Sequence, residues 1–369
     1  MAKLKLSFWE LHKNKIYAVA LIAIIGVSIG ASLWTISQHE GKIKLQVFHA
    51  GSLTVPFAEF AAAWMAMHPD YIIDNEGYGS ASAIRQITEL GRDADLLGSA
   101  DYTLIYPMMM NVTMPDSGGL QYADWYIIFA MNEMGIAYIP EKDPPYLENL
   151  TGGDNKWFEI LNRTDVTFGR ADPWQDPCGY RTLMVWGLAD DHYNLSGTAD
   201  PQDINQSMYA KDPIMGYSGP GVTKIRGKEV DLISLLEMGE IDYLFIYKSI
   251  AVQHGLGYLE LNDYVDLSNF TLDSFYQGVT VHRISPIVIG ASSPDKTGQT
   301  IQYGVTIPNN APHRENAIEY LKFILGYPGL LQELGQPPYY PAYASNISKL
   351  PTELQPYCVD YPFAQPYEK

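Results

Sequence analysis

A repeated strand–loop–helix pattern near the start of the chain is the feature that most constrains its fold. Alternating apolar residues predict a strand over 42–49, and apolar residues at helical spacing predict a helix over 55–68. A second strand at 71–75 precedes a helix at 83–90, and a third strand covers 94–98. Strands that alternate with helices form a parallel sheet, and ligands bind beyond the carboxyl ends of its strands. The sequence therefore predicts an α/β protein with a site in these loops.

Two of the loops place a serine just before a helix. Ser52 follows the first strand and Ser80 follows the second. A helix N-terminus presents unpaired backbone N–H groups and a positive partial charge, so it binds anions without an arginine. Either serine could instead be a simple helix cap. Because two consecutive strand–loop–helix units both place a serine just before the helix, we favour an anion site.

The segment Asp176–Arg181 lies in another loop of this kind, between a strand at 167–170 and a helix predicted to begin at Thr182. It combines a carboxylate, a proline, a thiol, a glycine and an arginine, and such density in a loop is typical of a functional site. A thiol active site is one alternative, with Cys178 as the nucleophile of a hydrolase or transferase. The histidines that could assist it, none of them in a recognisable motif, are His49, His192 and His254.

Later segments continue the α/β pattern. We expect strands at 125–130, 135–139, 243–247 and 304–307 and helices at 230–238 and 314–325. The range 149–162 is predicted to be a loop followed by an amphipathic helix. From Pro337 onward the chain is rich in proline and tyrosine, and we expect an irregular tail.

Composition limits the classes of ligand. The 369 residues carry a formal net charge of −18, which disfavours nucleic acid as a partner and gives no long-range attraction for an anion. An anion site must therefore act locally. The hydrophobic content of 47% and the length are enough for two folded domains.

The N-terminus has the features of an export signal or a membrane anchor. Four lysines, the last of them Lys15, precede an uncharged run of 21 residues over 16–36. A helix of that length spans a bilayer, and the basic flank places the remainder of the chain outside the cytoplasm. Cleavage of this segment stays open.

Glycosylation sequons indicate the same location. Seven are present, at Asn111, Asn149, Asn162, Asn194, Asn205, Asn269 and Asn346. They predict an exposed, glycosylated surface at these positions.

The chain has only two cysteines, Cys178 and Cys358, and whether they pair cannot be deduced from the sequence.

Several short segments, taken in order, resemble archaeal molybdate/tungstate-binding proteins, the solute receptors of oxyanion ABC importers. The resemblance runs from about Lys44 to about Pro337. The matching segments are Phe48–Leu53, Gly79–Ser80, Arg85–Ile87, Ala94–Tyr102, Asp176–Arg181, Lys228–Leu232, Gly239–Tyr243, Tyr247–Ser249 and Tyr303–Pro308.

The resemblance implies the class II periplasmic-binding-protein fold, with two α/β lobes that enclose a ligand cleft. Residues 1–40 would be the basic flank, the signal or anchor helix and a linker. Lobe I would comprise 42–130 and, after the chain returns, 302–369, whereas lobe II would comprise 131–301. It also implies a monomer that works with a membrane permease and an ATPase subunit, and that has no cofactor other than the transported anion.

The site implied by the resemblance holds molybdate or tungstate through serine and backbone donors, with two carboxylates that approach the metal centre. Its residues would be Ser52, Ser80, Asp176, Pro177, Cys178, Glu229 and Tyr247. Asp176 and Glu229 would reach the metal. Pro177 lacks an N–H, so donation at this point must come from Cys178. Asp172, Glu240 and Asp242 are competing carboxylates nearby in the sequence.

The two carboxylates have a physical consequence for selectivity. A carboxylate repels a dianion, so it helps binding only by donating electron density to the metal or by being protonated. A hard, high-valent metal prefers oxygen ligands, and sulfur in sulfate cannot expand its coordination in this way. Asp176 and Glu229 should therefore select molybdate and tungstate over sulfate. Receptors for sulfate, phosphate or ferric ion are the alternatives, the last because the chain is rich in tyrosine.

Overall fold

The computed structural model describes residues 41–369 apart from 152–156, 196–210, 212–217, 286, 289 and 363–369. The predicted anchor at 16–36 and the sequon at Asn205 lie outside the described residues, as does the side chain of Asn194. None of the helices in the described part of the chain combines the length and the apolarity that a membrane span requires.

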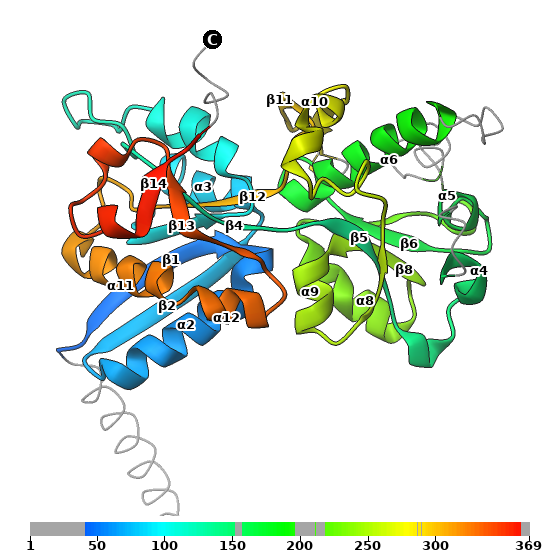
Figure 1. Cartoon of the computed structure of the whole chain (residues 1–369), viewed down its shortest axis with the longest axis horizontal. Helices are drawn as coiled ribbons and strands as arrows, with labels where there is room; N and C mark the ends of the chain where they lie inside the picture. The colour runs from blue at the N-terminus through cyan, green and yellow to red at the C-terminus, as the bar shows by residue number, and fades with distance from the viewer. Residues whose placement is uncertain are drawn as a thin grey trace, which may run out of the picture.

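Lobe I is built on a sheet to which seven strands of the described chain belong, in the order β14-β13-β4-β12-β3-β1-β2 (Figure 1). β1 pairs in parallel with β2 and β3, whereas β12 runs antiparallel between β3 and β4. The strands are β1 Ile43–Ala50, β2 Tyr71–Tyr78, β3 Leu96–Ser99, β4 Ile127–Met131, β12 Gln302–Thr306, β13 Pro338–Ala344 and β14 Cys358–Asp360. The helices of this lobe are α2 Thr54–Met67, α3 Ser80–Thr88, α11 Arg314–Gly326 and α12 Pro328–Glu333.

The apolar spacing of α2 explains how it packs. Phe57, Phe60 and Trp64 recur at helical spacing, and all three are buried. Trp64 packs against Tyr320 and Phe323 of α11, with ring centroids 5.6 and 5.4 Å away. One apolar stripe therefore fixes α2 and α11 side by side against the sheet, which holds the loop after β1 in place.

Lobe II is built on a sheet of five strands in the order β7-β6-β8-β5-β9, again counted over the described residues. The strands are β5 Met134–Tyr138, β6 Phe168–Ala171, β7 Lys224–Arg226, β8 Tyr243–Tyr247 and β9 Gly257–Glu260. The helices are α4 Leu147–Thr151, α5 Trp157–Leu161, α6 Pro177–Leu195, α8 Ile233–Met238, α9 Lys248–Gln253 and α10 Asp273–Tyr276. A separate antiparallel hairpin, β10 Thr280–Ile284 and β11 Ser292–Thr297, lies beside α6 near the gap between the lobes (Figure 1).

The chain crosses between the lobes twice. It passes directly from β4 to β5, and it returns from the hairpin to β12. Asn132 ties the two crossings together, because its side-chain amide donates to Ser249 Oγ at 2.7 Å and to the Tyr303 hydroxyl at 3.0 Å. Two lobes joined by two crossings are the predicted fold of periplasmic binding proteins.

Two predicted helix starts and one predicted irregular segment were wrong. α3 begins at Ser80 rather than at residue 83, so Ser80 lies within the helix and does not precede it. α6 begins at Pro177 rather than at Thr182, because proline fits the first helical position, where no N–H is needed. The tail expected to be irregular contributes β13 and β14 to the sheet. Its prolines are tolerated because the pairing of β13 with β4 shifts register between Pro338 and Tyr343.

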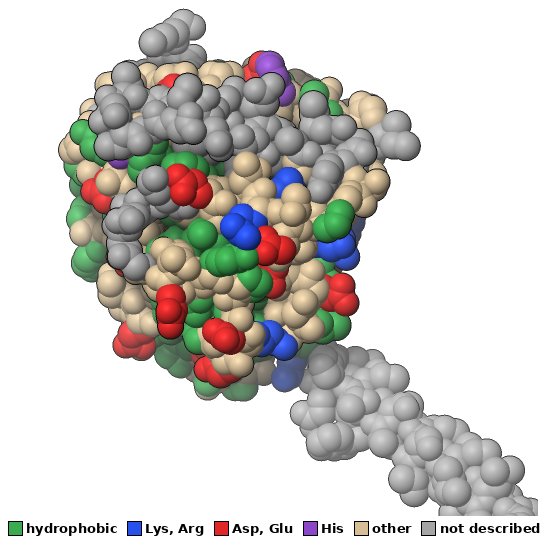
Figure 2. All heavy atoms as spheres, turned by 90° about the vertical axis from the view of Figure 1, so that its right-hand side faces the viewer, with side chains coloured by type: hydrophobic (Ala, Val, Ile, Leu, Met, Phe, Trp, Pro, Cys, Tyr) green, Lys and Arg blue, Asp and Glu red, His purple; other side chains and the backbone are tan. Residues whose placement is uncertain are grey.

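The acidic charge is dispersed on the lobe II end of the molecule. Figure 2 shows Asp and Glu side chains scattered there with Lys and Arg among them.

The sequons differ in exposure. Asn111, Asn149 and Asn346 are exposed as expected, but Asn162 and Asn269 are only half-exposed.

Candidate functional site

The two predicted serines lie at the carboxyl ends of neighbouring parallel strands of lobe I. Ser52 belongs to the short 3-10 turn Gly51–Leu53 that follows β1, and Ser80 is the first residue of α3, which follows β2. Both are buried, with 1% and 0% of their surface exposed. Neither side chain caps a helix. The simple capping interpretation is therefore wrong for both serines.

Each serine hydroxyl accepts one hydrogen bond from its own lobe. Ser52 Oγ accepts from the Tyr303 hydroxyl at 2.9 Å, and Ser80 Oγ accepts from the backbone N–H of Ala100 at 2.9 Å. A hydroxyl carries one donor proton besides its lone pairs. Within the described part of the chain no acceptor is found for either proton, so both are available to an anion.

Lobe II supplies the two predicted carboxylates. Asp176 immediately precedes α6, and its Oδ1 accepts from the N–H of Cys178 at 2.8 Å. Glu229 begins the 3-10 turn Glu229–Leu232 after β7, and its N–H donates to Asp176 Oδ2 at 3.2 Å. Tyr247, the third predicted residue of this lobe, ends β8. All three are at least 98% buried.

The carboxyl pair is electrostatically unfavourable without a ligand. Burial raises the pKa of Asp176 well above its usual range, and the neighbouring charge of Glu229 raises it further. Both carboxyl oxygens of Glu229 are buried and find no hydrogen-bond partner among the described residues. A buried polar group without a hydrogen-bond partner lowers the stability of the folded protein by about 1–3 kcal/mol. The carboxyl pair therefore does not serve to stabilise the fold, which points to a role in binding.

Two glycines of lobe I let the carboxylates approach the serines. A Cβ at Gly51 would lie 3.2 Å from Glu229 Oε2, so the carboxyl group of Glu229 abuts the turn that carries Ser52. A Cβ at Gly79, next to Ser80, would lie 2.2 Å from the carbonyl oxygen of Gln175. At Gly79 only glycine permits this approach, because the contact is with backbone, whereas at Gly51 the Glu229 side chain would have to shift by a few tenths of an ångström. The cleft is therefore closed over the site.

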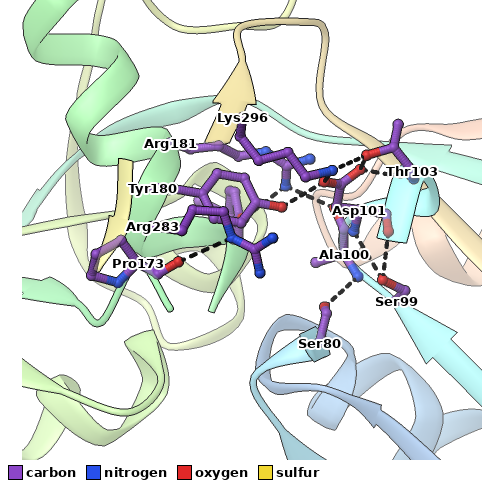
Figure 3. Close-up of polar contacts among 11 residues, drawn as sticks. Ser80, Ser99, Ala100, Asp101, Thr103, Pro173, Tyr180, Arg181, Arg283 and Lys296 are labelled. Atoms are coloured by element: carbon purple, nitrogen blue, oxygen red, sulfur yellow. Dashed lines mark hydrogen bonds and ion pairs between the residues drawn. The ribbon is translucent and has the colours of Figure 1, made fainter. Parts of the chain in front are cut away.

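Arg181 extends the site across the cleft toward Ala100 of lobe I (Figure 3). Arg181 Nη1 donates to the Tyr247 hydroxyl at 2.8 Å and to the carbonyl of Ala100 in lobe I at 2.7 Å. Arg181 is 2% exposed, and the bonds fix its guanidinium between the lobes. Because Tyr247 accepts from Arg181, its own O–H proton points elsewhere, and no acceptor for it is found among the described residues, so it can donate to a ligand. The motif Asp176–Arg181 contains this arginine, but nothing in its sequence indicates the bridging role.

A second inter-lobe contact lies beside the first. The buried carboxylate of Asp101 accepts from Lys296 of the hairpin at 2.9 Å and from the Tyr180 hydroxyl at 2.5 Å (Figure 3). Despite its burial, the charges of Lys296 and Arg181 hold the pKa of Asp101 well below its usual range. No local sequence pattern identifies Lys296, because its partner lies 195 positions away.

Pro177 and Cys178 lie in the first turn of α6 beside the carboxyl pair. The Cys178 N–H predicted to reach the anion donates to Asp176 in this structure. The thiol of Cys178 is buried and contacts the carbonyl of Phe245 at 3.7 Å, and burial raises the thiol pKa well above its usual range. An activated cysteine has a lowered thiol pKa, whereas the pKa of Cys178 is raised. Cys358 is also buried, and the two cysteines are not paired.

The competing carboxylates lie elsewhere. Asp172 is buried but accepts from the N–H of Trp174, from the Gln175 amide and from the Ser285 hydroxyl. Asp242 accepts from the Thr167 N–H, and Glu240 is exposed. Asp176 and Glu229 are thus the carboxylates that the fold brings together between the lobes.

Comparison with known proteins agrees with the fold and the motifs. Residues 45–329 match the family described as bacterial extracellular solute-binding protein. An uncharacterized solute-binding protein of Petrotoga mobilis is 41% identical over 317 residues, which cover 85% of this chain and 89% of the relative. The molybdate/tungstate-binding protein WtpA of Thermococcus kodakarensis is 39% identical over 323 residues, covering 85% of this chain and 86% of the relative.

A solved structure shares the fold at low sequence identity. The periplasmic molybdate-binding protein of Azotobacter vinelandii superposes with a TM-score of 0.52 at 11% identity, covering 79% of this chain and 98% of that one. The predicted resemblance and the predicted fold are both confirmed. The chain belongs to the bacterial extracellular solute-binding protein family.

Proposed function

We propose that this protein captures molybdate or tungstate outside the cytoplasm and delivers it to an ABC importer. Relatives that are 37–39% identical carry the name molybdate/tungstate-binding protein. The hydroxyl protons of Ser52, Ser80 and Tyr247 would hold the oxo groups of the anion, and Arg181 would orient Tyr247. Binding would need no cofactor.

The buried pair of carboxyl groups is the single observation that carries the proposal. A site for sulfate or phosphate gains nothing from Asp176 and Glu229, because both would repel the anion. A molybdenum or tungsten centre can accept additional oxygen ligands. The carboxyl oxygens of Glu229, which have no partner among the described residues, then acquire one.

Binding measurements on the purified full chain test the proposal. Calorimetric titrations with tungstate, molybdate, sulfate, phosphate and ferric citrate would compare the wild type with Asp176→Asn and Glu229→Gln. We expect tungstate and molybdate to bind far more tightly than sulfate, and each substitution to reduce that preference. Glu240→Gln is the matched control, because Glu240 is exposed. Unchanged discrimination in both variants, or tighter binding of sulfate by the wild type, would refute the proposal.

Delivery requires partners and a location. A closed receptor is recognised by a membrane permease that works with an ATPase, and opening of the lobes would release the anion. We propose that residues 16–36 hold a monomeric receptor at the membrane, with the sequons glycosylated on its outer surface. Membrane fractionation, N-terminal sequencing of the mature protein and intact mass measurement test these points. A mature chain that starts beyond residue 36 would contradict the anchor.

A further inference from the structure

A cavity of about 770 Å³ lies between the lobes and is separate from the candidate anion site. Lobe I contributes α3 and the turns after β3, whereas lobe II contributes the loop before α6 and the hairpin β10–β11. None of the residues predicted to hold the oxyanion lines it. Its volume is typical of sites for small organic ligands rather than for a single inorganic ion.

One wall of this cavity is apolar. Leu104, Pro107 and Met108 line it from lobe I, and Trp174 lines it from lobe II. The guanidinium of Arg85 lies 4.0 Å from the centre of the Trp174 ring. The guanidinium covers that face of the indole, so a flat or aliphatic body would pack against the remainder of Trp174 and the apolar wall beside it.

Besides Lys296, which is paired with Asp101, two arginines, one from each lobe, give the cavity its positive charge. Arg85 comes from α3 and donates to Ser293 Oγ at 3.0 Å, and Arg283 comes from β10 and has only 3% of its surface exposed. Arg85 Nη1 and Arg283 Nη2 are buried, and neither has a hydrogen-bond partner among the described residues. A buried guanidinium N–H without an acceptor is costly, because hydrogen bonds to charged groups are among the stronger ones.

The two guanidiniums also repel one another. Burial lowers the pKa of Arg85, and the charge of Arg283 lowers it further. The carboxylates of Glu89 and of the buried Asp172 act in the opposite direction, but the pKa of Arg85 is still lowered overall, so they offset the burial and the repulsion only in part. Glu89 is 3.6 Å from Arg85 but its side chain is 63% exposed, and Asp295 is engaged by His282 at the exposed end of the hairpin. Exposed charges of this kind are screened by water and salt.

We propose that this cavity is a second, outer binding site for a small organic anion. Its carboxylate or phosphate group would lie between Arg85 and Arg283, and its apolar body would pack against Trp174. Because the two arginines belong to different lobes, the bound anion would favour the closed form. Linkage then requires that it strengthen binding at the inner site, and this second effect rests on the proposed function.

Phenyl phosphate is a suitable probe, because its ring excludes it from a site that holds a bare oxyanion. Titration of the full chain, followed by ligand-observed NMR, should show saturable binding of phenyl phosphate. Three comparison ligands are titrated in the same way. Benzoate has the ring and a carboxylate, inorganic phosphate has the head group without the ring, and benzyl alcohol has the ring without a charge. We expect benzyl alcohol not to bind. The ratio of the affinities for phenyl phosphate and benzoate identifies the preferred head group.

Two substitutions locate the binding. Arg283→Gln should weaken phenyl phosphate binding about tenfold or more, as expected for loss of a charged hydrogen-bond partner. Met108→Trp should block the cavity from the lobe I side without removing a charge, so it tests the site even if Arg283→Gln disturbs folding. Phenyl phosphate binding that survives both variants, or no saturable binding by the wild type, would overturn the proposal.

The titration is run without tungstate and with saturating tungstate in alkaline buffer. Tighter phenyl phosphate binding in the presence of tungstate is the expected sign of linkage. If tungstate itself fails to bind, the proposed function fails while the outer site is still measured by the tungstate-free titration. If tungstate binds normally but phenyl phosphate does not, only the outer site is wrong.

Discussion

Glu229→Gln should stabilise the ligand-free protein while it weakens the binding of tungstate. Glu229 is 1% exposed, and both of its carboxyl oxygens lack partners among the described residues. Its charge is also one cause of the raised pKa of Asp176. An amide of the same size removes this repulsion and can donate to the carboxyl group of Asp176. The backbone bond from residue 229 to Asp176 is retained, because it involves only the N–H.

The size of the effect follows from the bond gained. A hydrogen bond to a charged group contributes about 1.5–3 kcal/mol, so we expect a gain of about 2 kcal/mol in the free energy of unfolding. At about 2–4 °C per kcal/mol for a domain of ordinary size, the melting temperature should rise by about 4 °C or more. Gains in stability at the expense of function are typical of binding sites.

The pH dependence gives an independent check. Asp176 has a raised pKa in the folded protein, so folding takes up a proton. Its contribution to stability is fully present below the ordinary aspartate pKa of about 4 and is lost as the pH rises toward the folded pKa. Glu229→Gln should flatten this loss, because one cause of the raised pKa is gone.

Thermal unfolding of ligand-free wild type and Glu229→Gln across this pH range measures both effects. Glu240→Gln serves as the control, since Glu240 is exposed and should change the melting temperature little. Addition of tungstate should raise the melting temperature of the wild type and of the control, but far less that of Glu229→Gln. A melting temperature that is unchanged or lower in ligand-free Glu229→Gln would refute the electrostatic reasoning.

Three further predictions concern closure and the thiol. Gly79→Ala places a Cβ 2.2 Å from the Gln175 carbonyl, so the lobes should no longer close and tungstate affinity should fall roughly 100-fold. Small-angle scattering should show no compaction on adding tungstate, whereas Gly329→Ala, where a Cβ meets nothing within 4 Å, should behave as wild type. Lys296→Met removes the cation that faces Asp101, so the dissociation rate of tungstate in stopped-flow measurements should rise about tenfold. Lys322→Met is its control, because Lys322 is a half-exposed lysine of α11 that pairs with Glu319 and not with Asp101. Equal rates in the two variants would contradict a closing role for Lys296. Cys178→Ala should keep tungstate affinity within about threefold, because only the backbone of this residue contacts Asp176. Native protein should react slowly with a thiol reagent, and rapid labelling of Cys178 would contradict its burial.

Local patterns were enough to predict much of the fold. The alternation in 42–49 and the buried run Tyr243–Tyr247 predict strands that the structure contains as β1 and β8. Such patterns depend on neighbours a few residues apart, so they can be read from one segment at a time. The first residues of α3 and α6 were less predictable, because the point at which a helix begins depends on tertiary contacts as well as on local sequence.

The sequence by itself determined which chemical groups are present and which loops carry them. Ser52, Ser80 and Asp176 each follow a strand, and strand ends of one sheet meet at a common edge. Only the tertiary structure decided which groups meet. Asp176 and Glu229 are 53 positions apart, and the hydroxyls of Ser52 and Tyr303 are 251 apart. The order of strands within each sheet and the closing of the lobes set these contacts. No short-range pattern contains that information, because hydrophobic burial specifies faces of strands and helices rather than their distant partners.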